Sequence, residues 1–214
     1  MDQKRIFLDT EGDAWHDRNR GAWHGRSLPD DDPLLLAIEA IPMTHNPRVL
    51  EIGCGDGSRL AWLAREKGAQ VAGIDPSAKS VSAALAQGVE AERGTADALP
   101  YEDASFDWVI FGFCLYLCDA DLLFKVAAEA DRVLRTPGWI IINDFYSPEP
   151  RFVPYRHHSG VRTLKMDFRT LFVWHPAYRS FSQSVGHHDH GGHTDDPEQW
   201  VATSILQKAG YPKE

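Results

Sequence analysis

The sequence lacks long hydrophobic runs and has few cysteines. No stretch of its 214 residues approaches the roughly 18 consecutive apolar residues of a membrane-spanning helix, and no apolar signal segment follows Met1 to Arg5. Three cysteines are odd in number and match no disulfide framework, as suits a reducing compartment. We therefore expect a cytoplasmic protein with no membrane partner.

Positive charge is also scarce. Lys and Arg total 22 against 31 Asp and Glu, which gives a formal net charge of -9 at pH 7. Such a charge repels nucleic-acid phosphates, so we expect no nucleic-acid partner. With 43% hydrophobic residues, the chain is long enough for one α/β domain with a buried core and short for two. The oligomeric state stays open.

A glycine-rich turn follows an apolar run near residue 50. Residues 49–52 predict a buried parallel strand, alternate glycines occupy 53–57, and 58–64 have helical spacing. Strand, glycine turn and helix bring backbone close to a ligand at a helix N-terminus. A dinucleotide fingerprint needs a third glycine where this chain has Ser58, which disfavours a nicotinamide cofactor. Instead, an acid, Glu51, stands two residues before the first glycine.

Short apolar strands then alternate with amphipathic helices up to residue 145. This alternation predicts a parallel, doubly wound sheet. Asp75 ends the second strand 22 residues beyond Gly53, as suits a carboxylate that accepts hydrogen bonds from two ribose hydroxyls. The expected strands are 49–52, 71–75, 89–94, 106–111 and 139–145, and the expected helices are 33–41, 58–64, 78–85 and 121–134.

The C-terminal part permits two interpretations. Residues 178–185 and 200–206 predict an antiparallel hairpin, whereas Asp196-Pro197-Glu198 before Trp200, closed by Gly210, is typical of a helix. We choose the hairpin, because the residues after Gly210 are too few to finish the sheet.

Five signals between residues 47 and 145 together resemble the class I S-adenosylmethionine (SAM) dependent methyltransferases. In order, and at that family's spacing, they are Glu51-x-Gly-x-Gly-x-Gly, Asp75, Asp97-Ala98-Leu99-Pro100, Phe106-Asp107 and Leu134-Arg135-Thr136-Pro137-Gly138. Residues 11–15 also resemble an N-terminal segment of bacterial small-molecule methyltransferases. The resemblance implies an α/β fold with a doubly wound, mostly parallel, seven-stranded Rossmann-like sheet that ends in a C-terminal antiparallel hairpin. It also implies SAM as cofactor.

The resemblance further implies which residues bind the cofactor. Glu51 and the glycine turn would surround the amino-acid tail of SAM, Asp75 its ribose and Asp97 its adenine. For each acid the alternative is turn capping, and for the N-terminal segment it is packing on the sheet. The residues that we expect to bind SAM are Trp15, Arg18, Glu51, Gly53, Cys54, Gly55, Asp75, Pro76, Asp97, Ala98 and Phe111.

Four polar residues are candidates for catalysis. Tyr116 follows the fourth strand, where related enzymes often place a polar residue facing the methyl group, and Asp144 ends the fifth strand. His157 and His158 are candidate proton acceptors, because histidine titrates near neutral pH. For Tyr116 the alternative is core packing, and for the two histidines it is a solvated loop. The histidines of residues 187–193 have glycine-broken spacing that matches no closed zinc site, so we expect no metal.

These observations predict a single domain that methylates oxygen or nitrogen of a small-molecule acceptor. The alternatives are a SAM-binding protein without transferase activity and a nicotinamide-dependent oxidoreductase. Aromatic side chains in residues 6–26 and 146–176 would shape the acceptor pocket. Within 1–214, we expect a cap segment (1–32), a SAM-binding core (33–145), a substrate-side insertion (146–176) and a C-terminal hairpin (177–214).

Overall fold

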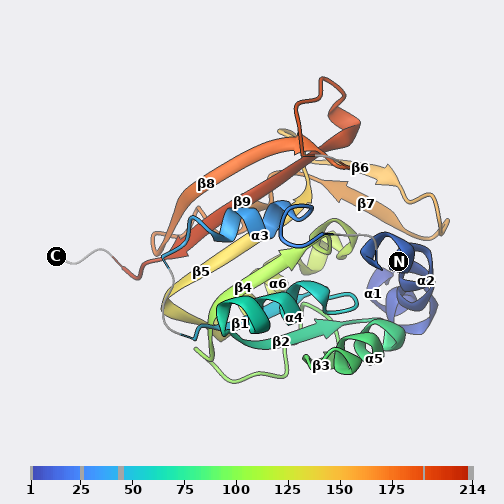
Figure 1. Ribbon diagram of the computed structural model, residues 1–214. Helices are drawn as coiled ribbons and strands as arrows, with labels where there is room; N and C mark the ends of the chain where they lie inside the picture. Colours follow the sequence, from blue (N-terminus) through green and yellow to red (C-terminus); the bar gives the residue numbers. More distant parts are fainter. Residues whose placement is uncertain (1, 25–26, 43–45, 190, 212–214) are drawn as a thin grey trace.

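A seven-stranded sheet runs through the computed structural model, which describes residues 2–24, 27–42, 46–189 and 191–211, with backbone alone at 22–24. The strand order is β3-β2-β1-β4-β5-β9-β8 (Figure 1). Neighbours among the first five strands are parallel, whereas β9 is antiparallel to both β5 and β8. The predicted fold class is thus confirmed. The parallel strands are β1 (Arg48–Ile52), β2 (Gln70–Asp75), β3 (Glu90–Arg93), β4 (Phe106–Gly112) and β5 (Leu134–Phe145).

Two hydrophobic layers cover the two faces of this sheet. In β4, Trp108 and Ile110 pack on one face, while Val109 and Phe111 pack on the other, as the two-residue period of a strand requires. The first layer includes side chains of α3, α4 and α5, and the second includes those of α6. These helices are α3 (Pro33–Ile38), α4 (Ser58–Lys67), α5 (Ala78–Ala86) and α6 (Leu123–Val133), and β4 leads to α6 through the 3-10 turns η2 (Leu115–Leu117) and η3 (Ala120–Leu122).

The C-terminal hairpin is confirmed as β8 (Tyr178–His187) and β9 (Trp200–Lys208). The competing helix signal produces only one 3-10 turn, η5 (Pro197–Gln199), where the Asp196 carboxylate accepts the backbone N–H of Glu198 at 2.9 Å. Elsewhere the boundaries shift. β5 begins at Leu134 rather than at 139, and the predicted helix 121–134 begins as a 3-10 turn.

The N-terminal segment docks on α5 through a glycine. It forms α1 (Gln3–Ile6), a π-helical turn η1 (Phe7–Glu11) and α2 (Gly12–His24). A Cβ at Gly12 would lie 2.6 Å from the Phe7 carbonyl oxygen and 3.2 Å from the Ser77 nitrogen, so only glycine permits this approach. Asp13 then accepts a hydrogen bond from the Ser77 hydroxyl at 2.6 Å.

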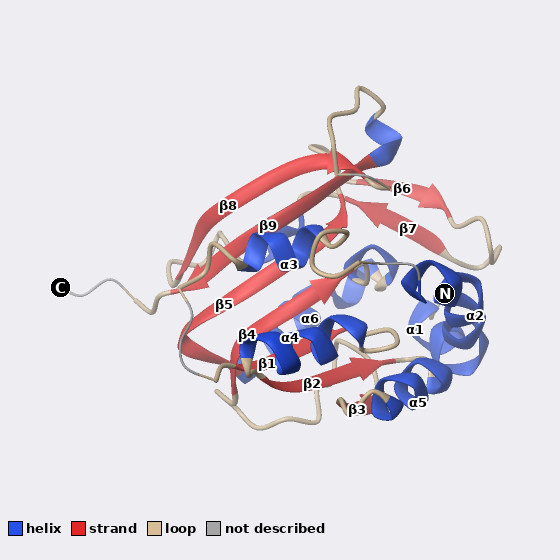
Figure 2. Ribbon diagram, viewed as in Figure 1, coloured by secondary structure: helices blue, strands red, loops and turns tan. Residues whose placement is uncertain are grey.

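The insertion forms a separate two-stranded sheet near the end of the molecule where α1 and α2 lie. Its antiparallel strands are β6 (Arg151–Pro154) and β7 (Arg162–Lys165), followed by η4 (Phe168–Leu171). Figure 2 shows β2 and β4 ending at the side where α1 and α2 lie, with β6 and β7 beside it. The carboxyl ends of the parallel strands therefore face the cap and the insertion. Across the described ranges, no helix has the length and apolarity to span a membrane.

Candidate functional site

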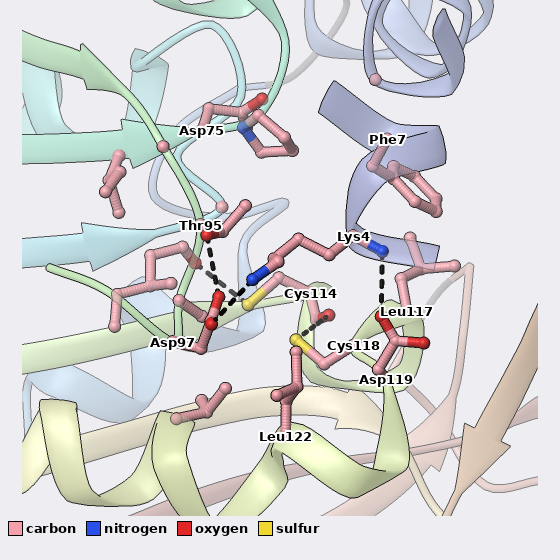
Figure 3. A pocket seen from close by; sticks show the side chains of 18 of the residues that line it. Lys4, Phe7, Asp75, Thr95, Asp97, Cys114, Leu117, Cys118, Asp119 and Leu122 are labelled. Atoms are coloured by element: carbon pink, nitrogen blue, oxygen red, sulfur yellow. Dashed lines mark hydrogen bonds and ion pairs between the residues drawn. The ribbon is translucent and has the colours of Figure 1, made fainter. Parts of the chain in front are cut away.

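A small cavity lies at the carboxyl ends of β1 and β2, beneath α1 and η1 (Figure 3). Its volume is about 110 Å³. Acidic and apolar side chains line it together, which suits a ligand with both hydroxyl groups and a flat ring. The lining includes Lys4, Phe7, Trp15, Gly53, Asp75, Pro76, Ala96, Asp97, Phe113 and Val126.

A larger, more polar cleft of about 1120 Å³ adjoins this cavity. Trp15, Gly53 and Phe113 line both, so the two spaces share a wall. The cleft is bounded by the glycine turn, the cap, the insertion and the loop between β8 and β9. Its lining includes Arg18, Glu51, Cys54, Gly55, Arg59, Tyr116, Phe145, His157, Lys165, His188 and Asp189.

Asp75 links the glycine turn to the start of α5. Its carboxylate accepts the backbone N–H of Gly55 at 3.0 Å and that of Ser77 at 2.9 Å. Burial raises the pKa of Asp75 to about 6, against the opposing effect of these two hydrogen bonds. The side chain borders the cavity beside Pro76, as a ribose-binding acid would.

The glycine turn has few free donors. The N–H groups of Gly53 and Cys54 both donate to the Ile74 carbonyl, at 2.8 and 3.2 Å, and that of Gly55 donates to Asp75. Gly53 has φ +76°, and a Cβ there would lie 2.6 Å from the Cys114 Cβ. A pyrophosphate needs free backbone N–H groups, so this turn suits a dinucleotide poorly.

Glu51 is buried beside Arg59 in the wall of the cleft. Its Oε1 accepts a hydrogen bond from Arg59, which also pairs with Asp32 at 3.0 Å. Its other oxygen, Oε2, is buried and has no partner among the described residues. Burial raises the pKa of Glu51 against the attraction of Arg59. A buried carboxylate oxygen without a donor fits the ammonium group of an amino-acid tail, as SAM carries.

Asp97 lies in the cavity wall with both oxygens engaged. It accepts hydrogen bonds from Thr95 Oγ1 at 2.8 Å, from Lys4 Nζ at 3.0 Å and from Lys125 Nζ at 3.3 Å. Burial alone would raise its pKa, but these donors hold the pKa below its usual value. Ala98 is exposed and donates its N–H to the Thr95 carbonyl at 3.2 Å. In this region the cavity is bordered by Ala96 instead.

Cap and insertion meet at the cleft where Tyr155 of the insertion joins the partly buried ion pair of Arg18 and Glu11. Arg18 donates hydrogen bonds to Glu11 and, at 3.0 Å, to the Tyr155 hydroxyl, which itself donates to Glu11 at 3.0 Å. Arg18 and Trp15 therefore reach the expected region, Arg18 at the cleft and Trp15 at both spaces. The sequence-based reasoning missed Glu11 as the anion that holds Arg18.

The structure corrects the placement of Phe111. This side chain is completely buried in the core, 6.4 Å from the ring of Phe172, and lines neither space. Phe113, two residues later, lines both. Its φ of +53° is unusual for a residue with a side chain and occurs just after β4 ends at Gly112, which the sequence pattern did not reveal.

Tyr116 and Asp144 have different environments. Tyr116 lines the cleft, its hydroxyl is hydrogen-bonded to Trp15, and burial raises the pKa of the phenol well above its usual value. Asp144 is completely buried and lines neither space. It accepts the N–H groups of Leu115 and Phe145, both at 2.8 Å, and burial raises its pKa to about 7. As a correction to its predicted catalytic position, Asp144 holds the turn that carries Tyr116.

The two histidines of the insertion also separate. His157 lines the cleft, with its ring 5.3 Å from that of Tyr155. His158 lies outside the lining, and its Nδ1 accepts the N–H of Gly160 at 3.1 Å, which closes a turn. A third histidine, His188, is exposed in the loop after β8 and also lines the cleft. The described residues hold no group of His, Cys, Asp and Glu suited to a metal ion, and His190 lies outside them.

Comparison with known proteins gives a consistent match. Residues 50–142 match the family model for a methyltransferase domain. Methyltransferase GfsG of Streptomyces halstedii is 35% identical over 116 residues, which cover 50% of this chain and 40% of that protein. The 27-O-demethylrifamycin SV methyltransferase of Amycolatopsis mediterranei is 33% identical over 154 residues, with 65% and 55% coverage. The chain thus spans about half the length of these relatives.

A solved structure extends the likeness over almost the whole fold. It is the Burkholderia thailandensis 1,6-didemethyltoxoflavin-N1-methyltransferase with bound 1,6-didemethyltoxoflavin and S-adenosylhomocysteine. The TM-score is 0.72 at 18% identity, with 96% of this chain and 89% of that chain covered. Together with the order of the strands and the glycine turn, these matches show that the chain belongs to the class I SAM-dependent methyltransferases, whose cofactor is SAM.

Proposed function

We propose that this chain transfers the methyl group of SAM to an oxygen or nitrogen atom of a small-molecule acceptor. The observation that carries the proposal is the wall of Trp15, Gly53 and Phe113, which the cavity and the cleft share. A ligand bound in the cavity would therefore lie next to a second ligand bound in the cleft. The names of two similar proteins support the acceptor class, since one is a 27-O-demethylrifamycin SV methyltransferase and the other a 1,6-didemethyltoxoflavin-N1-methyltransferase.

The cofactor would lie across both spaces. Asp75 would accept its ribose hydroxyls, and the unpartnered Oε2 of Glu51 would face its ammonium group. Asp97 would face the adenine ring of the cofactor. In the structure its carboxylate accepts a hydrogen bond from Lys4. Bound SAM supplies a methyl group that its positive sulfur has already activated, so the chain has to align an acceptor rather than create a reactive group.

Two side chains in the cleft can act on the acceptor. Because burial raises the pKa of Tyr116 well above its usual value, its hydroxyl stays neutral and can donate a hydrogen bond but not remove a proton. Trp15 is bonded to the same oxygen and fixes its direction. His157 of the insertion also lines the cleft, and the sequence predicts it as a proton acceptor.

The test uses SAM with an isotope-labelled methyl group and an extract of small metabolites. Label in a small-molecule product, and S-adenosylhomocysteine in equal amount, would support the proposal. SAM binding without label transfer to any fraction would favour the alternative of a binding protein. Thermal stabilisation by NAD rather than by SAM would favour the oxidoreductase.

A further inference from the structure

Four aromatic rings form one cluster where the cleft meets the cavity. Phe113 and Tyr116 follow β4, Phe145 ends β5, and His188 lies in the loop between β8 and β9. The Phe145 ring is central: its centroid lies 5.5 Å from Phe113, 4.9 Å from Tyr116 and 5.1 Å from His188. All four line the cleft, and Phe113 also lines the cavity. A flat acceptor bound here would lie next to the cofactor.

His188 is held within this cluster by three contacts of its ring and one of its backbone. Its ring stacks on Phe145 with an interplanar angle of 18° and meets Phe113 edge-on at 5.4 Å. Its backbone N–H donates to the Gln199 carbonyl at 2.9 Å, which ties the loop to η5. Its Nδ1 lies 2.8 Å from Oδ1 of Asp189.

The Asp189 contact selects one tautomer of the ring. A carboxylate can only accept, so the proton of neutral His188 belongs on Nδ1 and Nε2 keeps its lone pair. Nε2 has no hydrogen-bond partner among the described residues. Asp189 also lines the cleft, so both members of the pair are at the site.

Lys165, the cation beside the Phe145 ring, is already paired. Lys165 Nζ lies 4.9 Å from the centroid of the Phe145 ring and is bonded to the backbone oxygen of Glu198 at 2.7 Å and to its carboxylate at 3.1 Å. Arg151 pairs with the same carboxylate. His157, on the insertion side of the cleft, has an edge-on contact with Tyr155 but no carboxylate partner in the described part of the chain. Of the two cleft histidines, His188 is therefore the one set up as a base.

We propose that His188 is the catalytic base of this enzyme, that Asp189 positions it, and that the acceptor is an aromatic hydroxyl compound. This proposal rests on the proposed function. The flat ring of the acceptor would pack against the cluster of Phe113, Tyr116, Phe145 and His188, as aromatic pairs do.

The step balances without another reactant. The acceptor hydroxyl gives its proton to Nε2 of His188 as its oxygen attacks the methyl carbon of SAM. The carbon–sulfur bond breaks and its electron pair stays on sulfur, which leaves S-adenosylhomocysteine and a methyl ether. The imidazolium, stabilised by Asp189, then loses its extra proton to solvent.

The first test needs no acceptor. Side-chain ¹⁵N NMR of the whole protein, at a pH where the rings are neutral, should show His188 protonated on Nδ1. His193 provides an internal comparison, because its Nε2 lies 3.1 Å from Asp195 and should carry the proton instead. Asp189→Asn should reduce the Nδ1-protonated form of His188 and leave His193 unchanged. A parent His188 protonated on Nε2 would overturn the proposal.

The second test measures methyl transfer to phenol and 4-nitrophenol, with benzyl alcohol and aniline as acceptors of other classes. His188→Gln should lower the rate with phenol by about 10²- to 10⁴-fold, without changing SAM affinity. The same substitution should change the rate with 4-nitrophenol little in mildly alkaline buffer, because the hydroxyl group of 4-nitrophenol has already lost its proton there. His193→Gln is the matched control and should retain full turnover.

The outcomes separate this proposal from the proposed function. Transfer to phenols that His188→Gln retains, or transfer by the parent only to the alcohol or the amine, would overturn the present proposal alone. Absence of transfer from labelled SAM to these probes and to every small molecule in the metabolite extract would overturn the proposed function as well.

Discussion

Replacing Asp75 with asparagine tests the cofactor site most sharply. The carboxylate accepts two backbone N–H groups, from Gly55 and Ser77, and borders the cavity. Asparagine keeps the size of the side chain and one acceptor oxygen but removes the charge. We expect SAM to bind about 30- to 700-fold more weakly, because roughly 2–4 kcal/mol of charge-assisted hydrogen bonding to the ribose hydroxyls is lost.

The same substitution should change stability much less. Burial raises the pKa of Asp75 from the ordinary value of 3.8 to about 6, so protonation favours the folded state. The stability contributed by this group is fully present below about pH 4 and is lost as pH rises through about 6. At neutral pH the variant avoids a cost of roughly 3 kcal/mol and loses one backbone hydrogen bond of roughly 1–3 kcal/mol. The net change should lie within about 2 kcal/mol.

Calorimetric titration with SAM between about pH 5 and 8, together with thermal unfolding, is the assay. The affinity of the parent should fall as pH falls below about 6, because Asp75 becomes protonated, and the variant should show a weaker pH dependence. Asp107→Asn is a matched control: Asp107 also accepts a backbone N–H, that of Arg48 at 2.7 Å, but lies at the start of β4 away from the cavity. Unchanged SAM affinity in a folded Asp75→Asn protein would refute the ribose assignment.

Three further predictions concern the cap, the cleft and the surface charge. Gly12→Ala should lower the free energy of unfolding by about 1–3 kcal/mol, because its Cβ would meet the Phe7 carbonyl, whereas Gly21→Ala in the same helix has open space and should be neutral or stabilising in chemical denaturation. Tyr116→Phe should lower turnover about tenfold in steady-state assays while SAM affinity stays within about 1 kcal/mol; loss of both would show a structural role. Finally, with a net charge of -9, the protein should give no gel shift with unrelated oligonucleotides at micromolar concentration and physiological salt.

Much of the fold is predictable because local patterns determine it. The two-residue period of β4 places Trp108 and Val109 on opposite faces, and the acid that ends β2 lies at the cavity where parallel strands open. The competing helix signal at Asp196 fails because Trp200–Lys208 forms backbone hydrogen bonds with both β5 and β8. A helix over these residues would lose both sets of hydrogen bonds. Long-range pairing decides this case.

The rest of the site depends on contacts between segments distant in sequence. His188 reaches the cleft because the pairing of β9 with β5 brings the β8–β9 loop beside Phe145, and nothing within residues 187–193 indicates that neighbour. Glu11 becomes buried only through Arg18 and Tyr155, the latter 144 residues away. Phe111 is buried because it faces the same core layer as Val109 in β4, whereas Phe113, which reaches the cavity, has a left-handed backbone that a hydrophobicity pattern does not reveal.

A crystal structure of the complex with S-adenosylhomocysteine would test the central claim, that the cavity and the cleft form one site. We expect adenosine in the cavity with its ribose on Asp75, and the ammonium group at Oε2 of Glu51. The sulfur atom should lie at the wall shared by Trp15, Gly53 and Phe113, with its methyl-bearing side toward the cleft. A bound product whose sulfur atom lies away from this wall, or whose ribose does not contact Asp75, would contradict it.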